Sequence, residues 1–159
     1  MEYQTESPEK TKAVGKEIAT SLKGGDILLL SGDLGAGKTT LVKGIAEGLG
    51  IQEEITSPTF TLMNTYPVRL ARRSLGAGGS PKSEVRSLIH IDTYRLNSEN
   101  ELLAIGAEDY LGNPDTVCII EWPEKISTLL KDKKTTAIQL FHVSENIRKI
   151  IILQDIPDS

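Results

Sequence analysis

The stretch that decides the fold is Gly32-Asp33-Leu34-Gly35-Ala36-Gly37-Lys38-Thr39, which fits the pattern G-x-x-x-x-G-K-[ST] at every fixed position. An apolar run, residues 27–30, comes directly before it, as expected for a strand covered on both faces of a parallel sheet. Leu41, Ile45 and Leu49 follow it at helical spacing. A strand, a glycine-rich turn and an amphipathic helix in this order predict a phosphate-binding P-loop, whereas the turn alone would be only a flexible connection.

Each residue type in this turn has a role in holding a triphosphate. Glycine adopts backbone conformations that a Cβ forbids, so several N–H groups turn inward and form an anion nest at a helix N-terminus. Lys38 adds a positive charge for the β- and γ-phosphates, Thr39 a hydroxyl ligand for Mg²⁺, and Thr40 a further donor. The predicted contacts with ATP are Gly35, Ala36, Gly37, Lys38, Thr39 and Thr40. The guanine-selecting sequence Asn/Thr-Lys-x-Asp does not occur in the chain, which favours ATP over GTP.

Two further apolar runs each end in an acid. Residues 88–91 precede Asp92, and residues 117–120 precede Glu121. Parallel strands would bring both carboxylates to the sheet edge that carries the P-loop. Two acids at a phosphate site indicate two tasks, holding Mg²⁺ and orienting or deprotonating the attacking water. The spacing does not say which acid has which task, and either acid could instead cap the next turn.

The remaining pattern predicts an α/β fold, a P-loop NTPase-like three-layer sandwich whose parallel central sheet carries an antiparallel C-terminal hairpin. A helix from Ser7 and Pro8 has Val14, Ile18 and Leu22 on its inner face and stops at Gly24 and Gly25. Further predictions are an edge strand (60–66), a helix opened by a Ser98–Glu101 capping box, a short helix (126–130) and the two hairpin strands (136–141 and 147–153).

Two residues near Asp92 have alternative interpretations. His90 faces away from Ile89 and Ile91, and a hydrogen-bonded structural role is favoured over a catalytic one. Arg95 either stabilises charge on the γ-phosphate, as an arginine finger does, or pairs with an acid such as Glu101. Pairing is the favoured interpretation.

The composition excludes several classes of protein. A single cysteine, Cys118, cannot form an intrachain disulfide, and its apolar neighbours predict a buried, unreactive thiol. No apolar run approaches the roughly 18 residues of a membrane span, and residues 1–6 do not resemble a secretory signal. We expect a cytoplasmic protein without membrane association, in which residues 1–159 form one P-loop domain.

Four motifs in this order resemble the TsaE family of bacterial ATPases, which are required for threonylcarbamoyl modification of tRNA adenosine. The motifs are the P-loop 32–40, Ser57-Pro58-Thr59-Phe60, His90-Ile91-Asp92-Thr93-Tyr94-Arg95 and Glu121-Trp122-Pro123. The resemblance implies slow ATP hydrolysis, action with the partner proteins TsaB and TsaD, and at most indirect or weak contact with tRNA. It extends from about residue 8 to the C-terminal hairpin.

The resemblance also implies roles for individual residues. Glu121 and Thr39 would hold Mg²⁺, and Asp92 would be the second acid needed for hydrolysis, so the implied catalytic set is Lys38, Asp92 and Glu121. Trp122 would lie beside the nucleotide, Thr11 would approach its base, and the Ser57–Thr59 loop would act as a switch-like segment facing the phosphates. Judged by the residues alone, Trp122 is a core aromatic and the loop an ordinary turn.

Residues 66–87 depart from the short connection usual in this family. They contain five basic residues and one acidic residue, a local charge of +4 in a chain whose net charge is −4. We interpret them as a flexible basic insertion. Contact of the basic residues with tRNA phosphates or an acidic partner is the alternative.

Two other functions stay open at this point. A small-molecule kinase would use the same P-loop, and the arginines of the insertion leave room for a phosphate-covering lid. A nucleotide-dependent binding module with negligible turnover would order its Ser57–Phe60 loop around ATP and release partners when ATP is lost.

Overall fold

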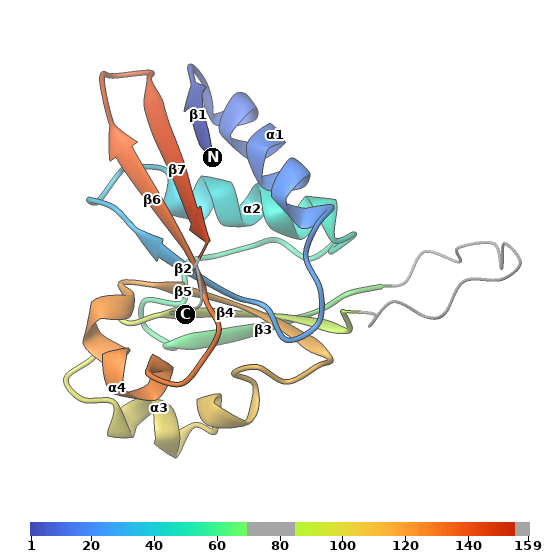
Figure 1. The fold of residues 1–159 in the computed structure, drawn as a ribbon, viewed down its shortest axis with the longest axis vertical. Helices are drawn as coiled ribbons and strands as arrows, with labels where there is room; N and C mark the ends of the chain where they lie inside the picture. Colours follow the sequence, from blue (N-terminus) through green and yellow to red (C-terminus); the bar gives the residue numbers. More distant parts are fainter. Residues whose placement is uncertain (70–84, 155–159) are drawn as a thin grey trace, which may run out of the picture.

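The computed structural model describes residues 1–69 and 85–154. Its single sheet has seven strands in the order β1-β7-β6-β2-β5-β4-β3, with the helices on both faces (Figure 1). Strands β2, β4, β5 and β6 are parallel; β3 pairs antiparallel with β4, β7 with β6, and β1 with β7. The strands are β1 (Glu2–Thr5), β2 (Ile27–Ser31), β3 (Met63–Pro67), β4 (Ser87–Asp92), β5 (Thr116–Glu121), β6 (Thr136–His142) and β7 (Arg148–Gln154). The predicted three-layer α/β fold with a C-terminal hairpin is confirmed.

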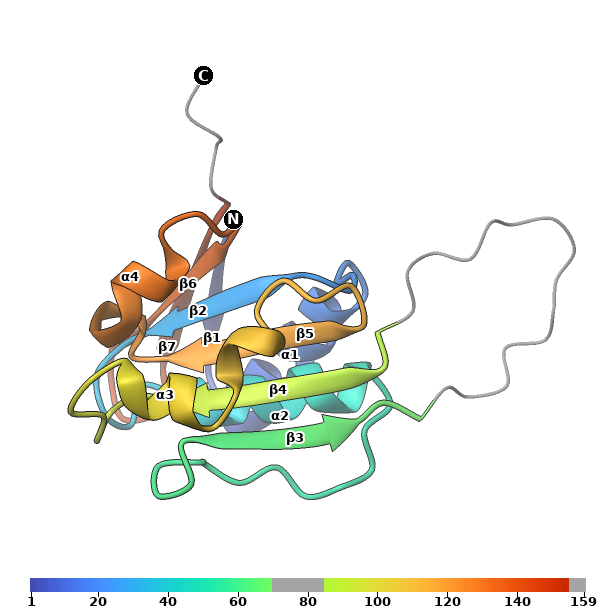
Figure 2. The same ribbon diagram turned by 90° about the horizontal axis from the view of Figure 1, so that it is seen from below.

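The helices divide into two layers. Helices α1 (Pro8–Ala19) and α2 (Lys38–Gly48) cover one face, and Figure 2 shows α3 (Asn100–Ala104) on the opposite face. The short elements η1 (Ala107–Asp109), η2 (Pro123–Ile126) and α4 (Ser127–Leu130) complete the second layer. Side chains along β2 point alternately to the two faces of the sheet. Leu28 and Leu30 therefore pack with α1 and α2, while Ile27 packs with the second layer.

Glycines bring α1 and α2 into close contact. A Cβ on Gly15 would lie 2.6 Å from the carbonyl oxygen of Leu41, and one on Gly44 would lie 2.3 Å from that of Lys12. No side chain fits at either point, so the two helix backbones approach each other directly. This packing fixes the N-terminus of α2, where the P-loop ends.

Several predicted boundaries are wrong. Helix α1 ends at Ala19, before Leu22. Strand β3 begins at Met63 rather than residue 60, since residues 59–62 turn, with the N–H of Leu62 bonded to the carbonyl of Pro58. The Ser98–Glu101 capping box does not form: α3 starts after Glu99 without a side-chain cap. Strand β1 was not predicted, because its four residues pair only with the distant β7.

The insertion predicted over residues 66–87 is shorter at both ends. Tyr66 and Pro67 belong to β3 and Ser87 to β4, and the N–H of Val68 bonds to the carbonyl of Arg86. These residues form the base of an antiparallel β3–β4 pair. Residues 70–84, which hold most of the predicted basic cluster, lie outside the described residues. Across the described part of the chain, no helix has the length and apolar character that a membrane crossing requires.

Candidate nucleotide site

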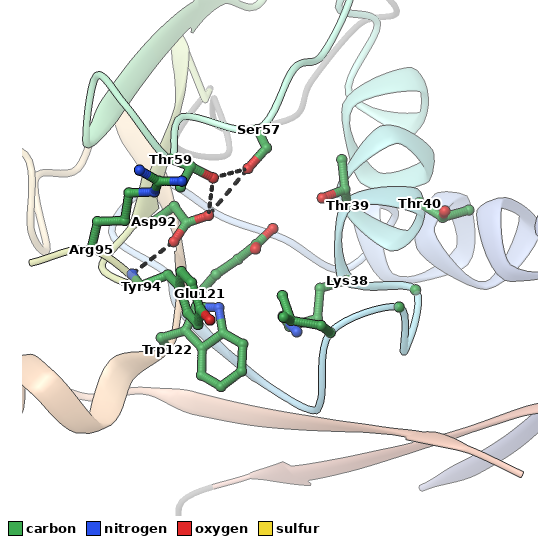
Figure 3. Close-up of a pocket in the computed structure, with 13 residues that line it drawn as sticks. Lys38, Thr39, Thr40, Ser57, Thr59, Asp92, Tyr94, Arg95, Glu121 and Trp122 are labelled. Atoms are coloured by element: carbon green, nitrogen blue, oxygen red, sulfur yellow. Dashed lines mark hydrogen bonds between the residues drawn. The ribbon is translucent and has the colours of Figure 1, made fainter.

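A cavity of about 370 Å³ opens at the carboxyl edge of the parallel strands, between the P-loop and the ends of β4 and β5 (Figure 3). The turn before α2, the loop before β3, and the residues that end or follow β4 and β5 all contribute to it. The lining residues are Leu34, Gly35, Gly37, Lys38, Thr39, Thr40, Ser57, Thr59, Asp92, Tyr94, Arg95, Glu121 and Trp122. Parallel strands therefore bring together segments that lie far apart in the sequence.

The P-loop has the backbone geometry that anion binding requires. Gly35 and Gly37 have φ angles of 79° and 101°, in the left-handed region that favours glycine. Gly37 is the N-cap of α2, and no side chain caps the helix there. The first N–H groups of α2 therefore remain available to a ligand. Ala36 is not among the residues that line the cavity: its N–H donates to the carbonyl of Asp33 and its side chain is buried in the core.

Lys38 lies almost wholly inside the molecule, with 6% of its surface exposed. Its Nζ donates to the carbonyl oxygens of Gly32 at 2.5 Å and Asp33 at 3.0 Å, and it lies 4.4 Å from the centroid of the Trp122 ring. Burial lowers the pKa of Lys38 from its ordinary value, while Glu121 and Asp92 act in the opposite direction. The ammonium is therefore held by backbone carbonyl oxygens, and phosphate oxygens can add to these acceptors or replace them.

The two acids are neighbours across the sheet. Asp92 and Glu121 pair in the parallel β4–β5 register, and each is only 3% exposed. Oδ2 of Asp92 accepts from the hydroxyls of Ser57 and Thr59, both at 3.1 Å, and Oδ1 accepts from the N–H of Tyr94 at 2.9 Å. The switch-like loop is thus attached to Asp92 (Figure 3).

Glu121 has a different partner. Its Oε1 lies 3.1 Å from Nε2 of His90, which is completely buried. His90 is therefore hydrogen-bonded, as the favoured interpretation expected. Among the described residues no hydrogen bond to Oε2 of Glu121 is found, and this side chain lines the cavity.

The oxygen ligands suit Mg²⁺. Thr39 and Glu121 line the same cavity, and Mg²⁺ is commonly held by one or two protein oxygens together with water and substrate phosphates. Among the described residues no group of three or more His, Cys, Asp or Glu side chains that could hold a metal ion is found. The residues present therefore fit this cation.

Trp122 is strained and lies at the cavity. Its φ angle of 59° is unusual for a bulky residue, and the Thr93 hydroxyl donates to its carbonyl oxygen at 2.5 Å and to that of Glu121 at 3.1 Å. Strain at a site edge is retained only where surrounding contacts enforce it. The indole stands between Lys38 and Tyr94, whose ring centroid is 5.1 Å away.

Thr11 is not in this cavity. It lines a second cavity of about 160 Å³, which shares Gly35, Gly37 and Thr40 with the first, and its hydroxyl is hydrogen-bonded to that of Thr5 at 2.7 Å. Arg148 also lines the second cavity, and its Nε donates to the carbonyl of Gly35 at 3.2 Å. Arg148 was not among the predicted site residues, because the β6–β7 hairpin reaches the P-loop only in the folded chain.

The favoured interpretation of Arg95 is wrong. Its guanidinium does not pair with Glu101 in the described structure but lies 4.4 Å from the centroid of the Phe60 ring. Phe60 is 82% exposed. Arg95 therefore lines the cavity and lies over Phe60, the residue that follows the Ser57–Thr59 loop.

The fold and the phosphate-binding turn define a protein of the P-loop α/β class. The family model described as "Threonylcarbamoyl adenosine biosynthesis protein TsaE" matches residues 5–150. Similar proteins include the "tRNA threonylcarbamoyladenosine biosynthesis protein TsaE" of Bacillus subtilis, 40% identical over 84% of this chain and 73% of that protein. The protein of the same name from Treponema pallidum is 38% identical over 96% of this chain and 99% of that protein.

A solved structure supports the same relationship. The crystal structure of Bacillus subtilis YdiB superposes with a TM-score of 0.69 at 33% identity, over 97% of this chain and 84% of that one. The chain belongs to the TsaE family, as its four motifs indicated.

Proposed function

We propose that this protein is a cytoplasmic, Mg²⁺-dependent ATPase of low turnover that takes part in making threonylcarbamoyladenosine in tRNA. TsaB- and TsaD-like proteins are its proposed partners, with tRNA contacted indirectly or weakly. The observation that carries the proposal is the convergence of Lys38, Thr39, Asp92 and Glu121 on one cavity beside a P-loop. Membership of the TsaE family supports the tRNA-modification hypothesis rather than a small-molecule kinase.

The proposal assigns a different role to each of these residues. The N–H groups at Gly37 and the start of α2 bind the phosphates, and Nζ of Lys38 turns from the carbonyls of Gly32 and Asp33 toward the β- and γ-phosphates. Thr39 and Glu121 would hold Mg²⁺, and the cation would supply positive charge to the bound phosphates. This arrangement would fix the triphosphate with its γ-phosphate toward Asp92.

Asp92 has the proposed role of orienting water. The carboxylate is held by Ser57, Thr59 and Tyr94, so its remaining lone pairs have defined directions. A water placed by them attacks the γ-phosphorus, the bond to the β-phosphate oxygen breaks, and ADP and phosphate leave. Since the loop residues Ser57 and Thr59 bond to this acid, the loop's position and the acid's orientation are coupled.

The test combines partner capture with turnover. Tagged protein is incubated with purified TsaB and TsaD in ATP, in ADP and without nucleotide, and phosphate release is measured in parallel. We expect nucleotide-dependent retention of both partners and phosphate release that needs no small-molecule acceptor. Phosphate transfer strictly dependent on an added acceptor would establish the kinase alternative instead.

A variant separates turnover from binding. Glu121→Ala should keep ATP binding and partner retention but abolish modification of tRNA in the reconstituted system, whereas Lys38→Ala should lose all three. If modification continues with Glu121→Ala, ATP binding alone suffices and the protein is a nucleotide-dependent binding module.

A further inference from the structure

His90 is a buried polar side chain that the phosphate chemistry does not require. It lies on β4 two residues before Asp92, on the face opposite Ile89 and Ile91, and none of its surface is exposed. In the β4–β5 register His90 stands beside Ile119, so the next residue of β5 on the same face is Glu121. The imidazole and the Glu121 carboxylate are therefore diagonal neighbours on one face of the sheet, inside the molecule.

The hydrogen-bond pattern fixes the tautomer of the imidazole. Nε2 of His90 lies 3.1 Å from Oε1 of Glu121, whereas Nδ1 is buried and has no partner among the described residues. A carboxylate oxygen accepts, so Nε2 carries the hydrogen of this bond. A hydrogen on Nδ1 would be a buried donor without an acceptor, which is more costly than an unused lone pair beside apolar atoms. The hydrogen-bond pattern thus assigns the imidazole as the donor to Glu121 through Nε2.

This bond restricts the carboxylate of Glu121. Oε1 is directed back into the sheet toward His90, while Oε2 has no hydrogen bond among the described residues and the side chain faces the cavity. Rotation about the terminal torsion of a free Glu is broad. With Oε1 held by a side chain of the rigid central sheet, Oε2 keeps one direction whether or not the loop over the cavity moves.

We propose that His90 is the positioning residue for Glu121, holding Oε1 so that Oε2 alone is presented to the Mg²⁺ of the nucleotide complex. The inference rests on the proposed function and adds a residue that none of the predicted roles includes. An imidazole that serves only packing would be replaceable by an apolar side chain, which would leave no nitrogen unsatisfied. The pairing with a carboxylate in the cavity gives the imidazole a task that packing alone does not supply.

The first experiment measures cation binding directly. His90→Gln keeps an N–H donor within reach of Glu121, whereas His90→Leu fills similar space without one. Each variant is saturated with a non-hydrolysable ATP analogue, and Mn²⁺ is titrated and followed by its paramagnetic resonance signal. We expect His90→Leu to weaken Mn²⁺ binding about 10–100-fold, with the metal-free affinity for the analogue unchanged, and His90→Gln to recover part of the loss.

Leu88→Val is the matched control, since Leu88 is a fully buried residue on the same strand and the same face. This variant should bind Mn²⁺ as the unaltered protein does. Equal Mn²⁺ affinities in His90→Leu and the unaltered protein would overturn the positioning role while leaving the ATPase proposal intact. Failure of the unaltered protein to bind the analogue at all would overturn the proposed function and this inference with it.

A second measurement needs no folded variant of His90. The chain has two histidines, so the ¹⁵N-detected imidazole signals of the unaltered protein are assigned by comparison with His142→Gln. We expect the His90 ring to carry its hydrogen on Nε2 and its Nε2 signal to shift when Mg²⁺ is added to the ADP complex. A ring protonated only at Nδ1, or one whose signals do not respond to Mg²⁺, would refute the proposal.

Discussion

Replacing Lys38 with Met should weaken ATP binding markedly without unfolding the protein. The stem of Lys38 is buried and its ammonium lies 4.4 Å from the centroid of the Trp122 ring, so an unbranched thioether fits the same space. The variant loses the hydrogen bonds to the carbonyls of Gly32 and Asp33. It also removes a charge whose burial is unfavourable, as the lowered pKa of Lys38 indicates.

The magnitudes separate binding from stability. Two hydrogen bonds at about 1 kcal/mol each, offset by the removed cost of a buried charge, leave the free energy of unfolding within about 2 kcal/mol of its original value. An ammonium about 4 Å from one phosphate charge gains about 4 kcal/mol at an effective dielectric constant of 20. After subtraction of about 2 kcal/mol for the two carbonyl contacts given up, a net loss of about 2 kcal/mol predicts about 30-fold weaker ATP binding.

Trp122 provides the assay, because it is the only tryptophan of the chain and stands beside Lys38. Its fluorescence is followed during titration with ATP and Mg²⁺, and calorimetry checks the affinity of each variant. Lys43→Met, on the same helix but outside the residues that line the cavity, is the control and should bind as the unaltered protein does. If Lys38→Met remains folded and its affinity falls by less than about threefold, the phosphates do not bind where we place them.

Three further changes test the site and the fold. Asp92→Asn should lower the rate of phosphate release by at least about 10²-fold, because the acid acts on water rather than on the bound phosphates. The affinity for ATP should stay within a few-fold. Equal losses of phosphate release and of ATP affinity would contradict that role. Gly44→Ala should reduce the free energy of unfolding in urea by about 1–3 kcal/mol, because the added Cβ would lie 2.3 Å from the carbonyl oxygen of Lys12. An unchanged midpoint of urea unfolding would argue against the close α1–α2 contact. Burial raises the pKa of the Cys118 thiol to about 11 from 9.0, so its stabilising contribution is complete below pH 9 and is lost as pH rises through 11. The unaltered protein should therefore lose about 2 kcal/mol more between pH 9 and pH 11 than Cys118→Ala in urea unfolding, and parallel pH profiles would contradict the shift.

The sequence was sufficient to predict the P-loop and the two acids at its edge. In a parallel sheet the carboxyl ends of strands share one edge, so a residue that ends an apolar run has its place in space fixed by the strand pattern. Asp92 and Glu121 reach the same cavity for this reason. The position of β3 at the edge of the sheet was likewise predictable, because this strand has few apolar residues.

Contacts that depend on strand register were not predictable. Whether His90 meets Glu121 is decided by the β4–β5 alignment, and a shift by one residue would reverse every side chain on the strand. Arg95 was expected to pair with an acid such as Glu101, but its guanidinium lies 4.4 Å from the centroid of the Phe60 ring, in a loop distant in sequence. Thr93, which bonds to the carbonyl of the strained Trp122, carried no sequence signal because its partner is a backbone group.

The two acids, equivalent in the sequence, differ in what holds them. Glu121 is bonded to His90, a buried side chain of the central sheet, so its direction is independent of the surface loops. Asp92 is bonded to Ser57 and Thr59, so a displacement of that loop removes two of its three hydrogen bonds. A cation ligand needs a constant position, whereas an acid that orients water can be turned on and off by a moving loop. The structural difference therefore supports Glu121 as the Mg²⁺ ligand and Asp92 as the acid through which loop movement controls hydrolysis.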